Sequence, residues 1–256
     1  SQLLVEAGKR LHLTAYTIKK PQKPTAFCMA LRKHLTNGKI LGLQQHEFER
    51  TVTISMGTRE GNFQLVTELF GEGNIILVNP QNVVLYALAY RRMRDRNILR
   101  GEVFKHAPST VRNPLNLSRL DLADLRAFGH LEVVRALTRL VSIGGLYAEE
   151  VLLRAAVEKT TRCEALTEQE LDGIFTQLRA LLYQLSGAET EPSIVINEKG
   201  EWVDVTPIRL ERYAHLRHRV YETFNEAVDE YFTQTGTMAR VSKVERELER
   251  ELSKLN

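Results

Sequence analysis

The stretch from Leu88 to His106, LAYRRMRDRNILRGEVFKH, is the part of the sequence around which the rest of the fold can be predicted. It carries six fixed positive charges, at Arg91, Arg92, Arg94, Arg96, Arg100 and Lys105. Only two acidic residues, Asp95 and Glu102, lie among them. An apolar run, residues 83–88, leads directly into this stretch and predicts a buried strand. The arginines would then leave the sheet at a strand end.

This concentration of arginine predicts a phosphate-binding site. The guanidinium group is a rigid, permanently charged fork that fits a phosphate through two hydrogen bonds. A cluster of such groups at one edge of a sheet is typical of nucleic-acid binding. The alternative interpretation is a solvated loop with surface ion pairs. Because the two local acids can pair with only a minority of the arginines, the pattern favours binding.

Four segments resemble one known family: LLVEAGKRLHLT, FCMALRKHLTNGKI, ELFGEGNIILVN and RRMRDRNILRGEVFKHAP. On these motifs the sequence is identified as a member of the archaeal-type NFACT-N family. This domain occurs in archaeal and eukaryotic ribosome-quality-control factors and in bacterial proteins once labelled fibronectin-binding. Family members have a further helix and strands before the first motif. The resemblance therefore implies that the extreme N-terminus is absent from this sequence.

The resemblance also implies a function. Such factors bind a large ribosomal subunit that still holds an obstructed peptidyl-tRNA, and they recruit aminoacyl-tRNA to extend the stalled chain at its C-terminus. The implied partners are tRNA, the large subunit and the peptidyl-tRNA complex, in the cytoplasm and without a membrane. An Asp-Arg pair in this region is required for tailing in the family, and Asp95-Arg96 matches it. We expect Arg96 to contact an RNA phosphate and Asp95 to orient it or a neighbouring base. The expected RNA-binding residues are Arg91, Arg92, Arg94, Asp95, Arg96, Arg100 and Lys105.

Composition narrows the other possibilities. A chain of 256 residues fits one large or two modest domains, and a net charge of only +3 means that nucleic acid must be bound by local patches. Cys28 and Cys163 are too few for a four-ligand zinc site, and the seven histidines show no metal-ligand spacing. We therefore predict no metal and no cofactor. No apolar run reaches membrane-spanning length.

The first part of the chain predicts an α+β fold with a mainly antiparallel sheet. A hairpin (residues 3–7 and 10–14) and a helix (25–35) precede the sheet. Short connections then join five strand-like runs, which favours a meander. The runs are residues 39–43, 48–56, 63–69, 74–79 and 83–90. We expect this NFACT-N domain to cover residues 1–111 and to resemble the N-terminal domain of the Fpg/Nei DNA glycosylases.

Residues 112–186 predict a helical domain, with helices at 118–128, 131–140 and 167–185 and a further helix that starts after a two-glycine turn in the segment 142–155. The turn Ser142-Ile143-Gly144-Gly145 resembles the helix-two-turn-helix of the Fpg/Nei enzymes, which contacts DNA phosphates. Backbone N–H groups at a helix start can bind an anion, so Ser142, Gly144 and Gly145 are candidate phosphate contacts. The alternative is a packing turn. The packing turn is favoured over direct phosphate contact, because Glu149 and Glu150 would repel a phosphate if they faced it.

The last part of the chain combines a hairpin, a basic segment and a charged helix. Residues 187–236 are expected to connect the domains, with a hairpin at 193–197 and 201–205. The segment 209–221 mixes arginine, histidine and tyrosine, which suits RNA binding or equally a helix whose tyrosines lie in the core. Phe224 and Phe232 are expected in the core. The apolar stripe in residues 240–256 predicts the start of a coiled-coil arm, assigned to 237–256.

Two other classes of function were considered. A base-excision enzyme of the Fpg/Nei type needs an N-terminal proline amine and an adjacent acid, and usually a cysteine-rich zinc element. Two cysteines disfavour it. A surface adhesin would need a secretion signal or wall anchor, and no such pattern is visible. No catalytic set can be placed from the sequence, so the chain is predicted to be a binding factor and not an enzyme.

Overall fold

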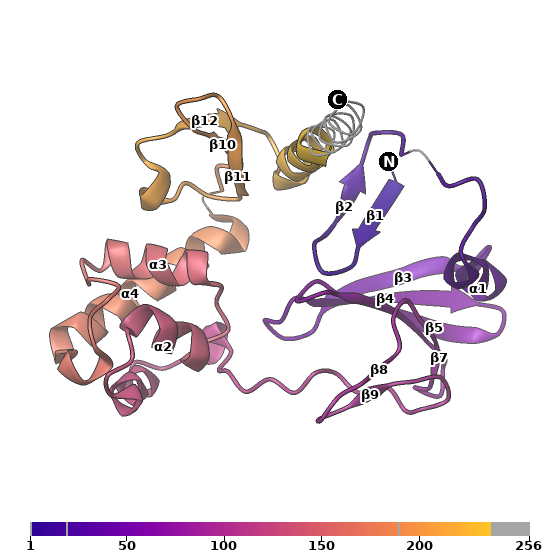
Figure 1. Cartoon of the computed structure of the whole chain (residues 1–256), viewed down its shortest axis with the longest axis horizontal. Helices are drawn as coiled ribbons and strands as arrows, with labels where there is room; N and C mark the ends of the chain where they lie inside the picture. Colours follow the sequence, from indigo (N-terminus) through magenta and orange to yellow (C-terminus); the bar gives the residue numbers. More distant parts are fainter. Residues whose placement is uncertain (1, 19, 189, 237–256) are drawn as a thin grey trace, which may run out of the picture.

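The computed structural model describes residues 2–18, 20–188 and 190–236. An antiparallel sheet, a group of helices and a small second sheet follow one another along the chain (Figure 1). The first described strands lie beside the last described helix, residues 224–236. The predicted start of a coiled coil at 237–256 lies outside the described residues. None of the described helices combines the length and the apolar character that a membrane span requires.

A five-stranded antiparallel meander forms the centre of the first part, and this confirms the prediction. In spatial order the strands are β3 (Lys39–Gln45), β4 (Thr51–Thr58), β5 (Gly61–Glu68), β6 (Asn74–Val78) and β7 (Val84–Ala87). The helix α1 (Ala26–Leu35) packs on β4 and β7. It begins as predicted at Thr25, whose hydroxyl accepts the Cys28 N–H at 3.2 Å. The buried cluster of this sheet is Val66, Ile76, Val78, Val84, Ala87, Ile98 and Phe104.

The predicted N-terminal hairpin, β1 (Gln2–Glu6) and β2 (Arg10–Thr14), touches the sheet through its turn. Gly8 N donates to Glu68 O at 2.9 Å. The backbone of Gly73, in the β5–β6 turn, approaches so closely that a Cβ there would lie 1.8 Å from Gly8 N. Gly73 also has a φ of +68°, a conformation that favours glycine. The turn therefore requires glycine for both conformation and space.

The other end of this hairpin is bound by the C-terminal helix 224–236. His12 Nε2 lies 3.1 Å from Asp229 Oδ1, and both side chains are buried. Asn225 forms two hydrogen bonds with the backbone of Leu13, donating to O at 2.9 Å and accepting from N at 2.8 Å. The N-terminal hairpin therefore links the C-terminal helix to the five-stranded sheet.

Asp229 makes this link sensitive to acid. Burial alone would raise the pKa of its carboxyl group, but hydrogen bonds from Thr14, the Ala15 N–H and His12 outweigh burial and lower it. A lowered folded-state pKa stabilises the protein above the ordinary value, near 4, and this contribution is lost as the pH falls through the folded-state pKa. We expect Asp229→Asn to lower the thermal midpoint at pH 7, and the gap to the parent chain to narrow toward pH 3. A gap that widens in acid would contradict this assignment.

The helical part has the predicted elements with one change of type. α2 (Val133–Leu140), α3 (Gly145–Arg154) and α4 (Glu168–Tyr183) are α-helices, and the predicted Thr167–Glu170 capping box opens α4. The segment expected as a helix at 118–128 is a 3₁₀ helix, η2 (Leu120–Phe128). The short 3₁₀ turns η1 (Pro114–Asn116) and η3 (Cys163–Ala165) flank these helices, and a single π-helical turn, η4 (Gln184–Ala188), follows α4. The fully buried side chains of the helical part include Leu122, Leu125, Leu137, Leu152, Leu171, Ile174 and Leu178.

The basic segment 209–221 does not form the helix that was one of its two interpretations. Its hairpin partners β10 (Ser193–Ile196) and β11 (Trp202–Thr206) are as predicted, but β12 (Arg217–Val220) adds a third strand beside β10. A 3₁₀ turn, η5 (Glu211–Tyr213), precedes β12. Phe224 is 38% exposed, so its expected core position is wrong. The C-terminal helix begins only at residue 224. The residues that a longer helix would have used, Arg217–Val220, form the edge strand β12 instead.

Candidate nucleic-acid interface

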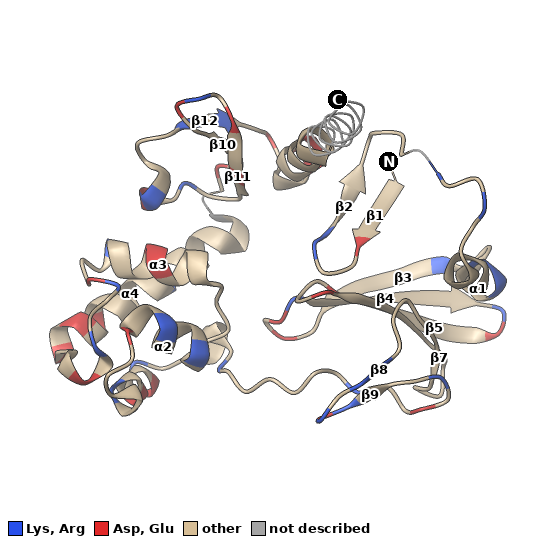
Figure 2. Ribbon diagram, viewed as in Figure 1, with Lys and Arg blue, Asp and Glu red and all other residues tan. Residues whose placement is uncertain are grey.

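The arginine-rich stretch leaves the sheet where β7 ends, as predicted. Asn74, buried at the start of β6, fixes this exit: its Nδ2 donates to Ala89 O at 2.8 Å and its Oδ1 accepts from Ala89 N at 3.0 Å. The chain then returns to the edge of β7, where Val84 N donates to Glu102 O at 2.9 Å. The stretch is therefore held by the sheet at both ends. Figure 2 shows its positive residues gathered on the two short strands between these points.

These short strands are β8 (Arg91–Arg92) and β9 (Asn97–Ile98), and with the turn between them they form what we call the basic hairpin. Met93 N donates to Arg96 O at 3.2 Å and closes the turn. Ile98 is fully buried in the sheet cluster and anchors one strand. The exposed residues of the turn are Met93, Arg94 and Asp95.

Arg96 has a different environment from its neighbours. Its side chain is 5% exposed, and its guanidinium lies 2.6 Å from Glu68 Oε1, which is also buried. The same group donates to the Lys105 carbonyl at 3.1 Å. A buried charge needs such partners, because desolvation without them costs several kcal/mol. The structure thus ties Arg96 to Glu68 and to the returning chain, whereas the sequence had suggested a guanidinium offered to RNA.

Four other cations are exposed, and none of them has an acidic partner within ion-pair distance among the residues that the structure describes. We call them the free cations: Arg92, Arg94, Arg100 and Lys105. Arg100 lies over the Tyr86 ring, with its guanidinium carbon 4.9 Å from the ring centroid. Arg91 is partly buried and lies 3.1 Å from Glu72, whose own side chain is 88% exposed. An ion pair this exposed contributes little and can be exchanged for a phosphate.

The glycine turn before α3 has a geometry that the sequence did not anticipate. Gly144 is the residue before the helix with a φ of −71°, and neither Gly144 nor Gly145 has a positive φ. A Cβ at either position would have nothing within 4 Å. Neither the backbone conformation nor packing within the described chain therefore requires glycine.

The surroundings of this turn do not favour an anion at Ser142. Its hydroxyl lies 3.4 Å from Glu49 Oε1, which places a carboxylate where a phosphate would sit. The turn faces a cavity of about 590 Å³ between the sheet and the helices. Glu150 does not face the turn as a free charge, because it is fully buried and bonds Arg154 at 2.6 Å. The structure therefore brings the candidate Ser142 close to an acid and leaves the glycine backbone accessible.

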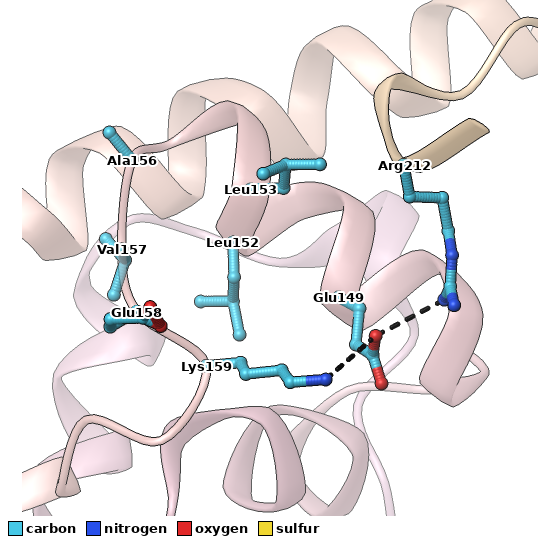
Figure 3. Close-up of a pocket in the computed structure, with 8 residues that line it drawn as sticks. All are labelled: Glu149, Leu152, Leu153, Ala156, Val157, Glu158, Lys159 and Arg212. Carbon is cyan, nitrogen blue, oxygen red and sulfur yellow. Dashed lines mark hydrogen bonds and ion pairs between the residues drawn. The ribbon is translucent and has the colours of Figure 1, made fainter. Parts of the chain in front are cut away.

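A second cavity, of about 390 Å³, lies beside α3 (Figure 3). Glu149 stands in it between Lys159, at 3.4 Å, and Arg212, at 3.3 Å. The rest of the lining is largely aliphatic: Leu152, Leu153, Ala156 and Val157. The described residues that line this cavity include no serine, threonine, cysteine or histidine that Glu149 could activate. No group of three or more potential metal ligands occurs among the described residues.

Sequence reasoning missed the internal partners of the arginines. Glu68 and Glu72 come from the β5–β6 hairpin and not from the arginine stretch. Both lie in the motif ELFGEGN, which was noticed only for its family resemblance. An acid on a neighbouring turn of the predicted meander was the available signal. Tyr86 was likewise interpreted only as part of an apolar strand, although the Arg100 guanidinium stacks over its ring.

The comparisons with known proteins agree with one another. The sequence model for NFACT N-terminal and middle domains matches residues 1–255. The archaeal Rqc2 homolog aRqcH of Methanocaldococcus jannaschii is 37% identical over 98% of this chain and 38% of its own length. The human ribosome quality control complex subunit NEMF is 24% identical over 91% of this chain and 24% of its own. The chain thus spans less than half the length of these two relatives.

Solved structures share the fold. The fibrinogen-binding protein of Staphylococcus aureus has a TM-score of 0.68 at 20% identity and covers 90% of this chain and 82% of its own. The N-terminal part of the fibronectin/fibrinogen-binding protein of Streptococcus suis has a TM-score of 0.65, also at 20% identity, with 91% and 82% covered. At this identity the likeness shows the fold alone. On the match over nearly its whole length, the chain belongs to the NFACT family, as its N-terminal and middle domains.

Proposed function

We propose that this chain is the tRNA-binding part of a ribosome-quality-control factor that acts in the cytoplasm. The proposal rests mainly on the four free cations, which are exposed on and beside the basic hairpin and have no acidic partner among the described residues. Phosphate contacts by Lys and Arg supply most of the affinity for RNA. The names of the relatives, an Rqc2 homolog and a ribosome quality control complex subunit, support the same function. The whole protein would hold tRNA at a large ribosomal subunit with peptidyl-tRNA, and would recruit aminoacyl-tRNA for tailing.

The two residues of the Asp-Arg pair would have different roles, Asp95 in contact with RNA and Arg96 in support of the turn. Asp95 is exposed at the tip of the hairpin, where its carboxylate can accept hydrogen bonds from the amino group of an unpaired base. Arg96 would act from inside, because its bonds to Glu68 and to the Lys105 carbonyl hold the turn that presents Asp95. Arg91 would join the free cations once a phosphate displaces Glu72. The chain would bind RNA by position and charge and would catalyse no reaction.

The exposed apolar side chains of the same stretch support an RNA ligand. Leu88, Tyr90 and Met93 are 51%, 49% and 38% exposed, respectively. Unstacked bases pack on aromatic and apolar side chains, and RNA is read mainly in its single-stranded loops. Duplex DNA offers no unstacked bases. We therefore expect folded tRNA to bind more tightly than duplex DNA at equal salt.

The test is tRNA binding by Arg92→Gln/Arg94→Gln, followed by fluorescence anisotropy over a salt series. Both residues are exposed and unpaired, so the variant should fold like the parent chain. The slope of log affinity against log salt should fall by roughly 1.4–1.8, which corresponds to two phosphate contacts. The control Arg179→Gln/Lys199→Gln removes the same charge from exposed positions in the helical part and the β10–β11 turn. Equal slopes for both variants would contradict the proposal.

A further inference from the structure

A long stretch of the chain contains no acidic residue. Residues 7–46 lack Asp and Glu entirely, yet they hold Lys9, Arg10, Lys19, Lys20, Lys23, Arg32, Lys33 and Lys39. Acidic residues make up 32 of 256 in the whole sequence, or one in eight, so forty residues would ordinarily carry several. With a net charge of +3 for the chain, this segment concentrates positive charge that the rest of the protein balances. Such a local excess is a footprint of binding to a polyanion.

The structure places five of these cations around α1. Two lie in the loop before the helix, two in its last turn and one at the first residue of β3, and all five are exposed. We call Lys20, Lys23, Arg32, Lys33 and Lys39 the α1 surface. Figure 2 shows this part of the chain with positive residues and no negative ones. None of the five has an ion-pair partner in the described part of the chain.

The fold does not need Arg32 and Lys33 for its own packing. Cations in the last turn favour the negative end of a helix, but at exposed positions this contributes only about 0.3–1 kcal/mol per charge. The Arg32 carbonyl at that end already accepts from Thr36 N at 3.2 Å. Of the three basic residues in this turn, only His34 packs inward, with its ring 5.7 Å from that of Phe63. An acid from the β4–β5 turn, Glu60, lies 3.5 Å from His34, and its side chain is 66% exposed. Arg32 and Lys33 are therefore available to an external ligand.

One residue, Tyr86, lies between the last turn of α1 and Arg100, near the end of the basic stretch. Tyr86, on β7, has the His34 ring 5.9 Å from its own ring centroid. The guanidinium of Arg100, one of the free cations, lies 4.9 Å from the same centroid. The last turn of α1 and the end of the basic stretch thus converge on a single tyrosine. A polyanion held by Arg100 would therefore lie beside the last turn of α1, which also carries Arg32 and Lys33.

We propose that the α1 surface is a second RNA-contacting surface, and that one RNA backbone runs from the basic hairpin across Tyr86 to Arg32 and Lys33. This inference rests on the proposed function. Phosphates spaced along a backbone suit cations spaced along a path, whereas the basic hairpin alone offers only a local cluster. Met29, 51% exposed on α1, and Ile40, 54% exposed on β3, add apolar surface for unstacked bases.

The test is Arg32→Gln/Lys33→Gln, measured with fluorescently labelled tRNA beside the basic-hairpin variant and the Arg179→Gln/Lys199→Gln control. The α1 variant should bind tRNA about tenfold more weakly near 0.1 M salt, and its salt slope should fall by roughly 1.4–1.8. Circular dichroism should show the same helix content and only a small fall in the thermal midpoint, because both side chains are exposed and neither forms an ion pair in the described part of the chain. The control should keep the affinity and slope of the parent chain.

The outcomes are separable. If the basic-hairpin variant loses affinity while the α1 variant does not, the second surface is refuted and the proposed function stands. If neither variant differs from the control, the proposed function fails as well. An anionic membrane would fit the same charges, so sedimentation with phosphatidylserine vesicles is run in parallel. Vesicle binding that the α1 variant alone loses, with unchanged tRNA binding, would overturn the inference in favour of a lipid surface.

Discussion

Arg96→Ala should lower the free energy of unfolding by about 3–5 kcal/mol, because it leaves the buried carboxylate of Glu68 without its partner. For a chain of this size that corresponds to a fall in the thermal midpoint of roughly 6–20 °C. The measurement is thermal unfolding followed by circular dichroism. An Arg96 that contacted an RNA phosphate from the surface, as the sequence suggested, could be removed with little change in the midpoint. The burial of Arg96 reverses that expectation.

Two variants show whether burial is the cause. Arg94→Ala, two residues away on the exposed turn, should change stability by less than about 0.5 kcal/mol. Replacing the pair together, Arg96→Met with Glu68→Leu, should recover most of the loss, because apolar side chains can often substitute for a buried ion pair. That double variant also isolates RNA binding from folding. A midpoint for Arg96→Ala within a degree of the parent would refute the assigned role.

Gly73→Ala should release the N-terminal hairpin from the sheet. The added Cβ would lie 1.8 Å from Gly8 N, and the residue has a φ of +68°. The conformation alone costs about 1–2 kcal/mol, and a backbone clash cannot be relieved by turning a side chain. We expect the free energy of unfolding to fall by more than about 3 kcal/mol in total, because strain at a special backbone conformation and a steric clash are among the causes of large destabilisation. Hydrogen exchange of residues 2–14 should rise more than that of β4 and β5.

Gly71→Ala is the matched control for this prediction. Gly71 lies in the same turn with a φ of +57°, but a Cβ there would have nothing within 4 Å. It should therefore cost only the conformational term, about 1–2 kcal/mol, and should leave the hairpin docked. Equal exchange rates in the two variants would mean that contact between Gly8 and Gly73 does not hold the hairpin.

The meander and the helix starts could be predicted because their signals are local. Alternating apolar residues joined by short turns leave few other arrangements than neighbouring antiparallel strands. The N-cap residue Thr25 and the Thr167–Glu170 capping box each mark the start of a helix by a pattern of at most four residues. β12 carried no such signal: its residues Arg217 and Arg219 are polar and exposed, and it is a strand only because β10 offers an edge.

The arrangement of the site depended on contacts between separate segments. Counting charges within the basic stretch identified a cluster and its family, but it could not show which arginine turns inward. The acid that decides this, Glu68, lies 28 residues before Arg96 at the end of β5, and only the folded meander brings them together. The free cations remain a prediction as RNA contacts. Their exposure could be anticipated, whereas the buried role of Arg96 could not.

The contact between the N-terminal hairpin and the C-terminal helix has a consequence for synthesis on the ribosome. His12 and Asp229 are 217 residues apart in sequence. At about 5–20 residues per second, the hairpin waits roughly 10–45 s for its partner helix to be made. During that time His12 and Thr14, which are buried in the finished structure, face water. Completion of this fold is therefore timed by translation, and β1 and β2 reach their final contacts only after the C-terminal helix has been made.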